Sequence, residues 1–176
     1  MSSKRVVFIW LASIILLAIF AGLSWLNLEL SPEAGGQEFE ITGYQVFPVI
    51  SALLLLQLAA VLASFLTPIT VARSISGLLA PIMLAHALFV AMGLQSNLQN
   101  AVEAQITEIT GVAGFASQAE FVVFAGDTYL WIGYLLAIGA NVAALLTRAL
   151  SKTGSSESRS TKTEVVDELD LWETQK

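Results

Sequence analysis

Four long stretches of this 176-residue chain are almost wholly apolar and contain no charged residue, which constrains the fold more than any other feature. They cover residues 6–26, 46–66, 75–94 and 129–147. At about 1.5 Å of rise per residue, a helix over any of them is about 30 Å long, the thickness of a bilayer's hydrocarbon core. Because a chain in lipid must satisfy its backbone hydrogen bonds internally, each stretch is predicted to be a transmembrane helix.

The composition places the chain among integral membrane proteins. Charged residues make up 12 % of the sequence, apolar residues make up 56 %, and the mean hydropathy is +0.74. A soluble domain of this size carries about a quarter charged residues. The sequence has no cysteine, which excludes disulfides, thiolate nucleophiles and cysteine-ligated metals.

The predicted fold class is an all-α membrane protein, with four transmembrane helices in an up-down bundle. The bundle is a single domain over residues 1–150, and a polar tail follows over residues 151–176. The link at 67–74 is short, so the second and third helices form a tight hairpin. A signal peptide is the alternative for the first stretch, but its length and the tryptophans near its ends favour a helix that is not cleaved.

The two connections on the other side of the bundle differ in pattern. Residues 27–45 are acidic and rich in turn-forming residues, which predicts a loop. In the longer connection, apolar residues recur at helical spacings of four, four and three: Leu98, Val102, Ile106 and Ile109. This pattern predicts a short external amphipathic helix that lies on the membrane surface or over the mouth of the bundle. We expect its apolar stripe to be a contact for a partner subunit.

The distribution of charge predicts the orientation. With four spans, all eight Lys and Arg residues fall on the side that holds both termini. Eight acidic residues fall in the connections 27–45 and 95–128, which contain no Lys or Arg. Because basic segments stay on the cytoplasmic side, we expect a multi-pass protein of the plasma membrane with both termini in the cytoplasm.

Three polar side chains are predicted to lie inside the spans, namely Gln57, His86 and Asn141. The simplest interpretation is that they make hydrogen bonds between helices, and the alternative is that they line a small cavity together. An ionisable residue at membrane depth is a functional candidate, yet His86 has no charged residue at mid-depth with which to relay a proton.

The sequence contains no Gly-rich phosphate loop, metal-ligand spacing or nucleophile motif. We therefore expect no enzymatic activity, no cofactor, no metal site and no nucleic-acid partner. The expected partners are membrane lipids and other membrane-protein subunits.

The tail combines a flexible Ser- and Thr-rich linker at 151–163 with an acidic segment at 164–172. In that segment Val165, Leu169 and Trp172 share one helical face. Two interpretations remain open: a disordered acidic end, or a docking motif in which the tryptophan contacts a partner.

Three short segments carry a family resemblance. Thr42-Gly43 precedes Pro48 ahead of the second span, residues 109–114 read ITGVAG, and residues 170–172 read DLW. The chain resembles the actinobacterial tryptophan-associated transmembrane proteins in these segments and in the order of its spans, although Leu130-Trp131-Ile132 stands where that family typically has Trp-Pro. The resemblance implies four spans and no catalytic residues.

In size and plan the chain is also similar to accessory subunits of the actinobacterial cytochrome bc–cytochrome oxidase supercomplex. We therefore expect an accessory subunit of a larger membrane complex, with that respiratory supercomplex as the leading candidate. The alternative is a small-solute carrier or carrier helper linked to tryptophan metabolism. A carrier usually has broken helices in repeated halves, and only Pro81 suggests a break here.

The orientation is testable by labelling single cysteines. We expect Ser31→Cys and Gln105→Cys to react with an impermeant thiol reagent on intact cells, and Ser155→Cys to react only after lysis. Labelling of position 155 in intact cells would reverse the orientation.

Overall fold

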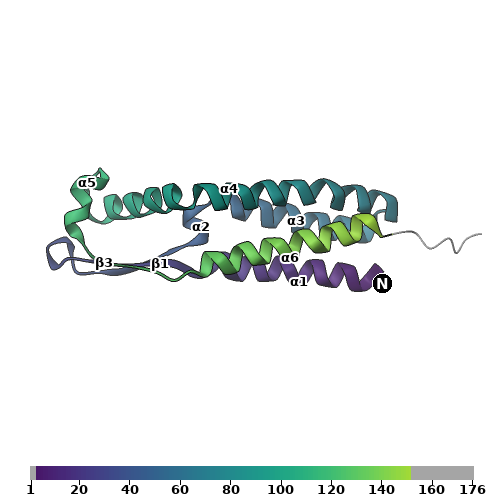
Figure 1. The fold of residues 1–176 in the computed structure, drawn as a ribbon, viewed down its shortest axis with the longest axis horizontal. Helices are drawn as coiled ribbons and strands as arrows, with labels where there is room; N and C mark the ends of the chain where they lie inside the picture. The colour runs from purple at the N-terminus through teal and green to yellow at the C-terminus, as the bar shows by residue number, and fades with distance from the viewer. Residues whose placement is uncertain (1–2, 152–176) are drawn as a thin grey trace, which may run out of the picture.

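A computed structural model describes residues 3–151 of the chain, and the tail residues Val165, Leu169 and Trp172 lie outside this range. Figure 1 shows an elongated molecule in which helices run nearly parallel and three strands extend from one end. The elements are α1 (Ser3–Gly22), β1 (Ser24–Leu30), η1 (Pro32–Ala34), β2 (Glu38–Thr42), α2 (Gly43–Val46), α3 (Val49–Leu66), α4 (Ile69–Thr110), α5 (Phe115–Gln118), η2 (Ala119–Phe121), β3 (Val122–Asp127) and α6 (Leu130–Leu150).

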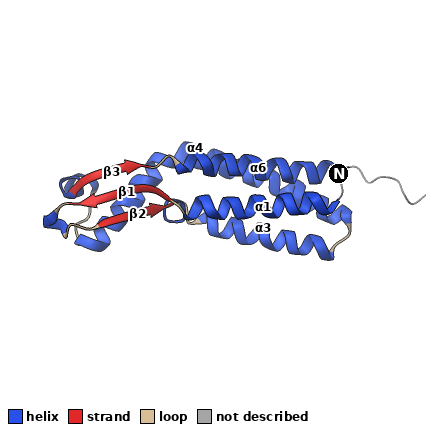
Figure 2. Cartoon of the chain, turned by 90° about the horizontal axis from the view of Figure 1, so that it is seen from below, coloured by secondary structure: helices blue, strands red, loops and turns tan. Residues whose placement is uncertain are grey.

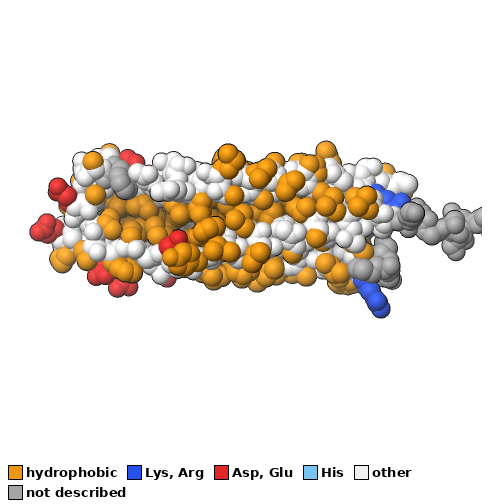
Figure 3. Space-filling model, viewed as in Figure 1, with side chains coloured by type: hydrophobic (Ala, Val, Ile, Leu, Met, Phe, Trp, Pro, Cys, Tyr) orange, Lys and Arg blue, Asp and Glu red, His pale blue; other side chains and the backbone are white. Residues whose placement is uncertain are grey.

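The predicted four-span bundle is confirmed. Helices α1, α3, α4 and α6 are each long and apolar enough to cross a bilayer. They alternate in direction, so the described ends of the chain lie at the same end of the bundle (Figures 1 and 2). Figure 3 shows apolar side chains along the length of the bundle, acidic side chains at the strand end and basic side chains at the opposite end.

The end of the molecule opposite the termini forms a small folded unit, here called the head (residues 23–48 and 95–129). Its three strands form an antiparallel sheet in the order β2-β1-β3, which lies alongside the far part of α4 (Figure 2). Leu28, Leu30 and Ile41 are buried in the head. The sequence analysis did not predict this sheet, because it assigned 27–45 to a loop.

Helix α4 is the longest element and joins the bundle to the head. The predicted third span and the predicted external amphipathic helix are in fact one helix of 42 residues, about 63 Å long. No residue between Leu94 and Leu98 stops the helix, since Gln95, Ser96 and Asn97 are polar but compatible with helical backbone. The helix ends at Gly111, which adopts the left-handed conformation (φ 71°) that glycine tolerates best.

Three other predicted boundaries move for identifiable reasons. The first span ends at Gly22 rather than at residue 26, because the chain enters β1 at Ser24. The second span begins at Val49 rather than at residue 46, because the short helix α2 ends at Val46 and Pro48 precedes α3. The link between α3 and α4 shortens to Thr67 and Pro68, because Pro68 caps α4 at its first turn.

The junction between the bundle and the head is packed around Trp25. This side chain is fully buried, and its indole Nε1 donates a hydrogen bond to the backbone carbonyl of Phe20 at 2.9 Å. A Cβ atom added at Gly43 would lie 2.6 Å from the Trp25 ring and 3.0 Å from the carbonyl oxygen of Ala21. Only glycine fits here without displacing the tryptophan.

The close contact at Gly43 predicts that adding one methyl group there destabilises the fold. We expect Gly43→Ala to lower the stability of the folded protein by about 1–3 kcal/mol, the usual cost of overpacking a core. Gly139→Ala is the matched control, because no atom would lie within 4 Å of its Cβ. Thermal unfolding in detergent measures both, and equal melting temperatures for the two variants would show that the junction is not tightly packed.

Candidate functional site

A polar cluster ties three helices together inside the bundle. The Gln57 side-chain oxygen on α3 accepts hydrogen bonds from Trp10 Nε1 on α1 at 3.1 Å and from Asn141 Nδ2 on α6 at 2.8 Å. Asn141 Nδ2 also donates to the Ser13 hydroxyl at 2.8 Å, and Gln57 Nε2 lies 3.0 Å from the sulfur of Met83 on α4. The interhelical contact predicted for Gln57 and Asn141 is therefore present in the structure.

The cluster is enclosed by protein. Gln57 and Asn141 have no exposed surface, and Ser13 and Met83 are almost fully buried. Such bonds between membrane helices contribute about 1 kcal/mol each. Because their polar groups are mostly engaged with one another, the arrangement favours a structural role over solute binding.

His86 lies apart from this cluster and pairs with Tyr134. The His86 Nε2 atom is 3.0 Å from the Tyr134 hydroxyl, and the two rings meet edge to face with their centroids 6.0 Å apart. Tyr134 in turn packs on Trp25, whose ring contacts Phe47. His86 thus belongs to an aromatic layer below the head, and no acidic group is among its hydrogen-bond partners.

The head contains a cavity of about 450 Å³ between the far part of α4 and the sheet. Figure 3 shows apolar side chains gathered in this region, between α4 and the strands. None of the lining residues is charged: they are Leu26, Leu28, Gln95, Leu98, Gln99, Val102, Ile106, Gln118, Ala119, Val122 and Ala125. An apolar cavity of this size with a few polar groups is typical of a small-molecule site.

Gln118 supplies an unusual polar group to the cavity wall. Its side chain is 1 % exposed, and its Nε2 donates to the Val112 carbonyl at 2.7 Å and lies 2.9 Å from the Thr107 hydroxyl. These acceptors fix the orientation of the amide, which leaves the oxygen Oε1 buried without a hydrogen-bond partner. A buried acceptor without a donor costs about 1–3 kcal/mol, so a donor on a bound molecule would stabilise the site.

The stripe of apolar residues predicted to meet a partner faces the chain's own sheet. Val102 and Ile106 are buried in the core of the head, while Leu98 and Ile109 are half-buried against it. The reason is the sheet, which covers the face of α4 that sequence periodicity alone would leave exposed. Three members of the stripe, Leu98, Val102 and Ile106, line the cavity.

The sequence does contain a signal for the missed sheet. In β1, Leu26, Leu28 and Leu30 alternate with Asn27 and Glu29, which is the period of a strand with one buried face. Had the strand been recognised, the apolar face of α4 would have had a partner within the chain. No sequence pattern marks Gln118 in this way, because the hydrogen bonds that orient its amide depend on the conformation of the loop around Val112.

No metal-binding cluster is present among residues 3–151, since no three His, Asp or Glu side chains there lie close enough together. Among the features that could carry a function are the two intramembrane polar groupings and the apolar cavity in the head.

Residues 6–174 of the chain match the family model of the tryptophan-associated transmembrane proteins. This range includes all four spans and the head. No curated protein and no solved structure is significantly similar to the chain.

Proposed function

We propose that this chain, which belongs to the family of tryptophan-associated transmembrane proteins, is a non-enzymatic accessory protein whose head binds a small apolar molecule. The observation that carries this proposal is the uncharged cavity of about 450 Å³ beside the buried Gln118 oxygen. The protein would act as a carrier helper, holding the molecule at the membrane surface.

The chemistry of the cavity favours an apolar ring that carries one N–H or O–H group. Leucine, valine and isoleucine side chains supply most of the contact surface, and the Gln118 oxygen would accept the hydrogen bond. Because this oxygen is enclosed, a ligand would reach it when the side chains around it part. Indole, the apolar ring of tryptophan, has this combination of groups.

Free tryptophan fits the same cavity poorly. The ammonium and carboxylate groups of tryptophan would lose their hydration in this cavity, whose lining contains no charged residue. Removing these charges from water carries a large desolvation penalty. The proposal therefore distinguishes an indole-like molecule from the amino acid itself.

The polar side chains described inside the spans are largely bonded to one another and do not favour a site for this solute. Gln57 and Asn141 are fully buried and bonded to each other, and His86 is bonded to Tyr134. A carrier needs a polar site near mid-depth between helices that can separate. The described geometry thus supports a helper that binds outside the spans.

The proposal can be tested by equilibrium dialysis of the purified protein against indole, with empty micelles as the blank. We expect saturable binding of indole and binding of 1-methylindole that is about tenfold weaker, because methylation removes one hydrogen bond worth about 1.4 kcal/mol. Tryptophan should bind more weakly than either.

Two variants locate the site. Ala125→Phe places a ring in the cavity and should abolish indole binding, whereas Ala104→Phe places the same ring on the exposed face of α4 and should not. Equal binding by these two variants, or tighter binding of tryptophan than of indole, would contradict the proposal.

A second candidate function is that of a structural subunit in a larger membrane complex, with the respiratory cytochrome bc–oxidase supercomplex as the leading candidate. The observation that favours it is the edge strand β3, which pairs only with β1 and leaves Val123 61 % and Phe124 56 % exposed. Exposed apolar residues on an unprotected strand edge are typical of a protein–protein contact.

This candidate predicts that the contact depends on β3. We expect Val123→Glu with Phe124→Glu to reduce co-purification of partner subunits in mild detergent, while Ala104→Glu retains them. If the double variant keeps every partner, the head edge is not the contact. Indole binding that persists in that variant would separate the two candidate functions.

A further inference from the structure

Arg148 is a cation buried at the end of the bundle that holds the termini. It lies two residues before the end of α6, and only 4 % of its surface is exposed. The guanidinium carbon lies 5.5 Å from the centroid of the Trp10 ring on α1. Its Nε and Nη1 atoms are enclosed, and neither has a hydrogen-bond acceptor in the described part of the chain.

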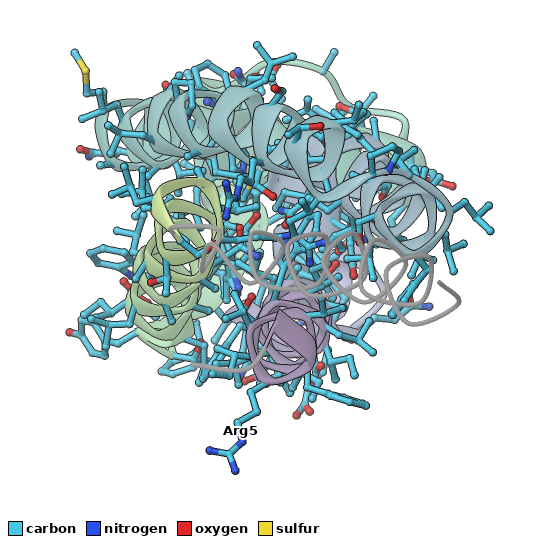
Figure 4. All side chains as sticks on the ribbon, turned by 90° about the vertical axis from the view of Figure 1, so that its right-hand side faces the viewer. Arg5 is labelled. Carbon is cyan, nitrogen blue, oxygen red and sulfur yellow. The ribbon has the colours of Figure 1, made fainter. Side chains whose placement is uncertain are left out.

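This placement calls for an anion. A stacked indole ring offsets only part of the cost of removing a guanidinium group from water, and a buried cation normally has an anionic partner. Arg5, at the same end of the bundle, shows the alternative: its side chain is exposed and points away from the helices (Figure 4). Arg148 is buried, and within residues 3–151 its Nε and Nη1 atoms have no acceptor.

Arg148 is one of the residues that line a cavity of about 420 Å³ at this end of the bundle. The cavity is lined by Val7 and Phe8 of α1, Ser64 and Phe65 of α3, Thr67, Ile69 of α4, and Arg148.

The polar groups of this cavity favour an oxyanion. The Ser64 hydroxyl donates to the Val61 carbonyl at 2.6 Å, and the Thr67 hydroxyl donates to the Ala63 carbonyl at 3.0 Å, so both donors are already used. The lining also includes Arg148, whose Nε and Nη1 have no acceptor in the described part of the chain, and Ile69, the first residue of α4. The first backbone N–H groups of a helix have no acceptor within the helix. The start of a long helix carries a partial positive charge and favours a negative ligand.

The apolar part of the lining indicates a ligand with a hydrocarbon chain. Phe8 is 70 % exposed and Phe65 is 66 % exposed, and both belong to membrane-spanning helices. We propose that this cavity binds the phosphate group of an anionic phospholipid, with Arg148 and the start of α4 holding the phosphate and with an acyl chain along Phe8 and Phe65. The site is on the leaflet that faces the termini, and it is independent of the cavity in the head.

The proposal can be tested by native mass spectrometry of the full chain released from nanodiscs that contain phosphatidylglycerol and phosphatidylcholine in equal amounts. We expect the wild-type protein to retain phosphatidylglycerol at one molecule per chain. Arg148→Gln should reduce this retention at least about tenfold, since it removes a charged contact. Arg5→Gln should leave the retention unchanged, because Arg5 points away from the bundle.

A second variant keeps the test decisive if Arg148→Gln fails to fold. Ser64→Phe fills the cavity and leaves Arg148 in place, and it should lose the retained lipid to the same extent. Retention that is unaffected in both folded variants would overturn the proposal.

Two further outcomes would identify a different anion. If inorganic phosphate at millimolar concentration protects the lipid-free protein from heat as well as phosphatidylglycerol does, the ligand is free phosphate. If lipid binds only after truncation at Ser151, carboxylates of the acidic tail occupy the site. Either result would overturn the assignment to a phospholipid.

Discussion

The structure depends on the requirement that polar groups inside a bilayer find their partners within the protein. The Gln57 side-chain oxygen accepts hydrogen bonds from both Trp10 and Asn141. This one acceptor therefore provides a partner for two buried donors and joins α1, α3 and α6. In water these groups would be solvated in any helix arrangement. In lipid these bonds form only when the three helices meet at these positions, so one shared acceptor contributes specificity beyond its modest energy. The Asn141 oxygen Oδ1 stays buried without a partner among the described residues.

A second constraint acts where the helices leave the bilayer. Backbone that leaves a helix there can bond to water, but this chain pairs it within a sheet that begins two residues after α1 ends. Trp25 seals the boundary by filling the space between Phe47 and Tyr134. The bundle and the head are thus continuous through one packed aromatic layer rather than joined by flexible loops.

The sequence predicts the parts of this architecture that arise from local composition. Uncharged runs of the right length predict the four spans, and the mid-span positions of Gln57 and Asn141 predict a contact between helices. The sheet was missed because its short alternating segments lie among acidic and turn-forming residues, which look like a loop. The burial of Arg148 could not be predicted, because it depends on how α6 packs against Trp10 and not on any nearby residue.

The length of α4 has a mechanical consequence. A single uninterrupted helix of 42 residues runs through both the bundle and the head, and Pro81 lies in the part that belongs to the bundle. Proline removes one backbone hydrogen bond from the ladder, which makes that turn the natural pivot of the helix. A small tilt about Pro81 would be amplified over the 29 residues that follow it to Thr110, about 44 Å of rod. The same tilt would change the gap between α4 and the sheet, where the cavity of the head lies.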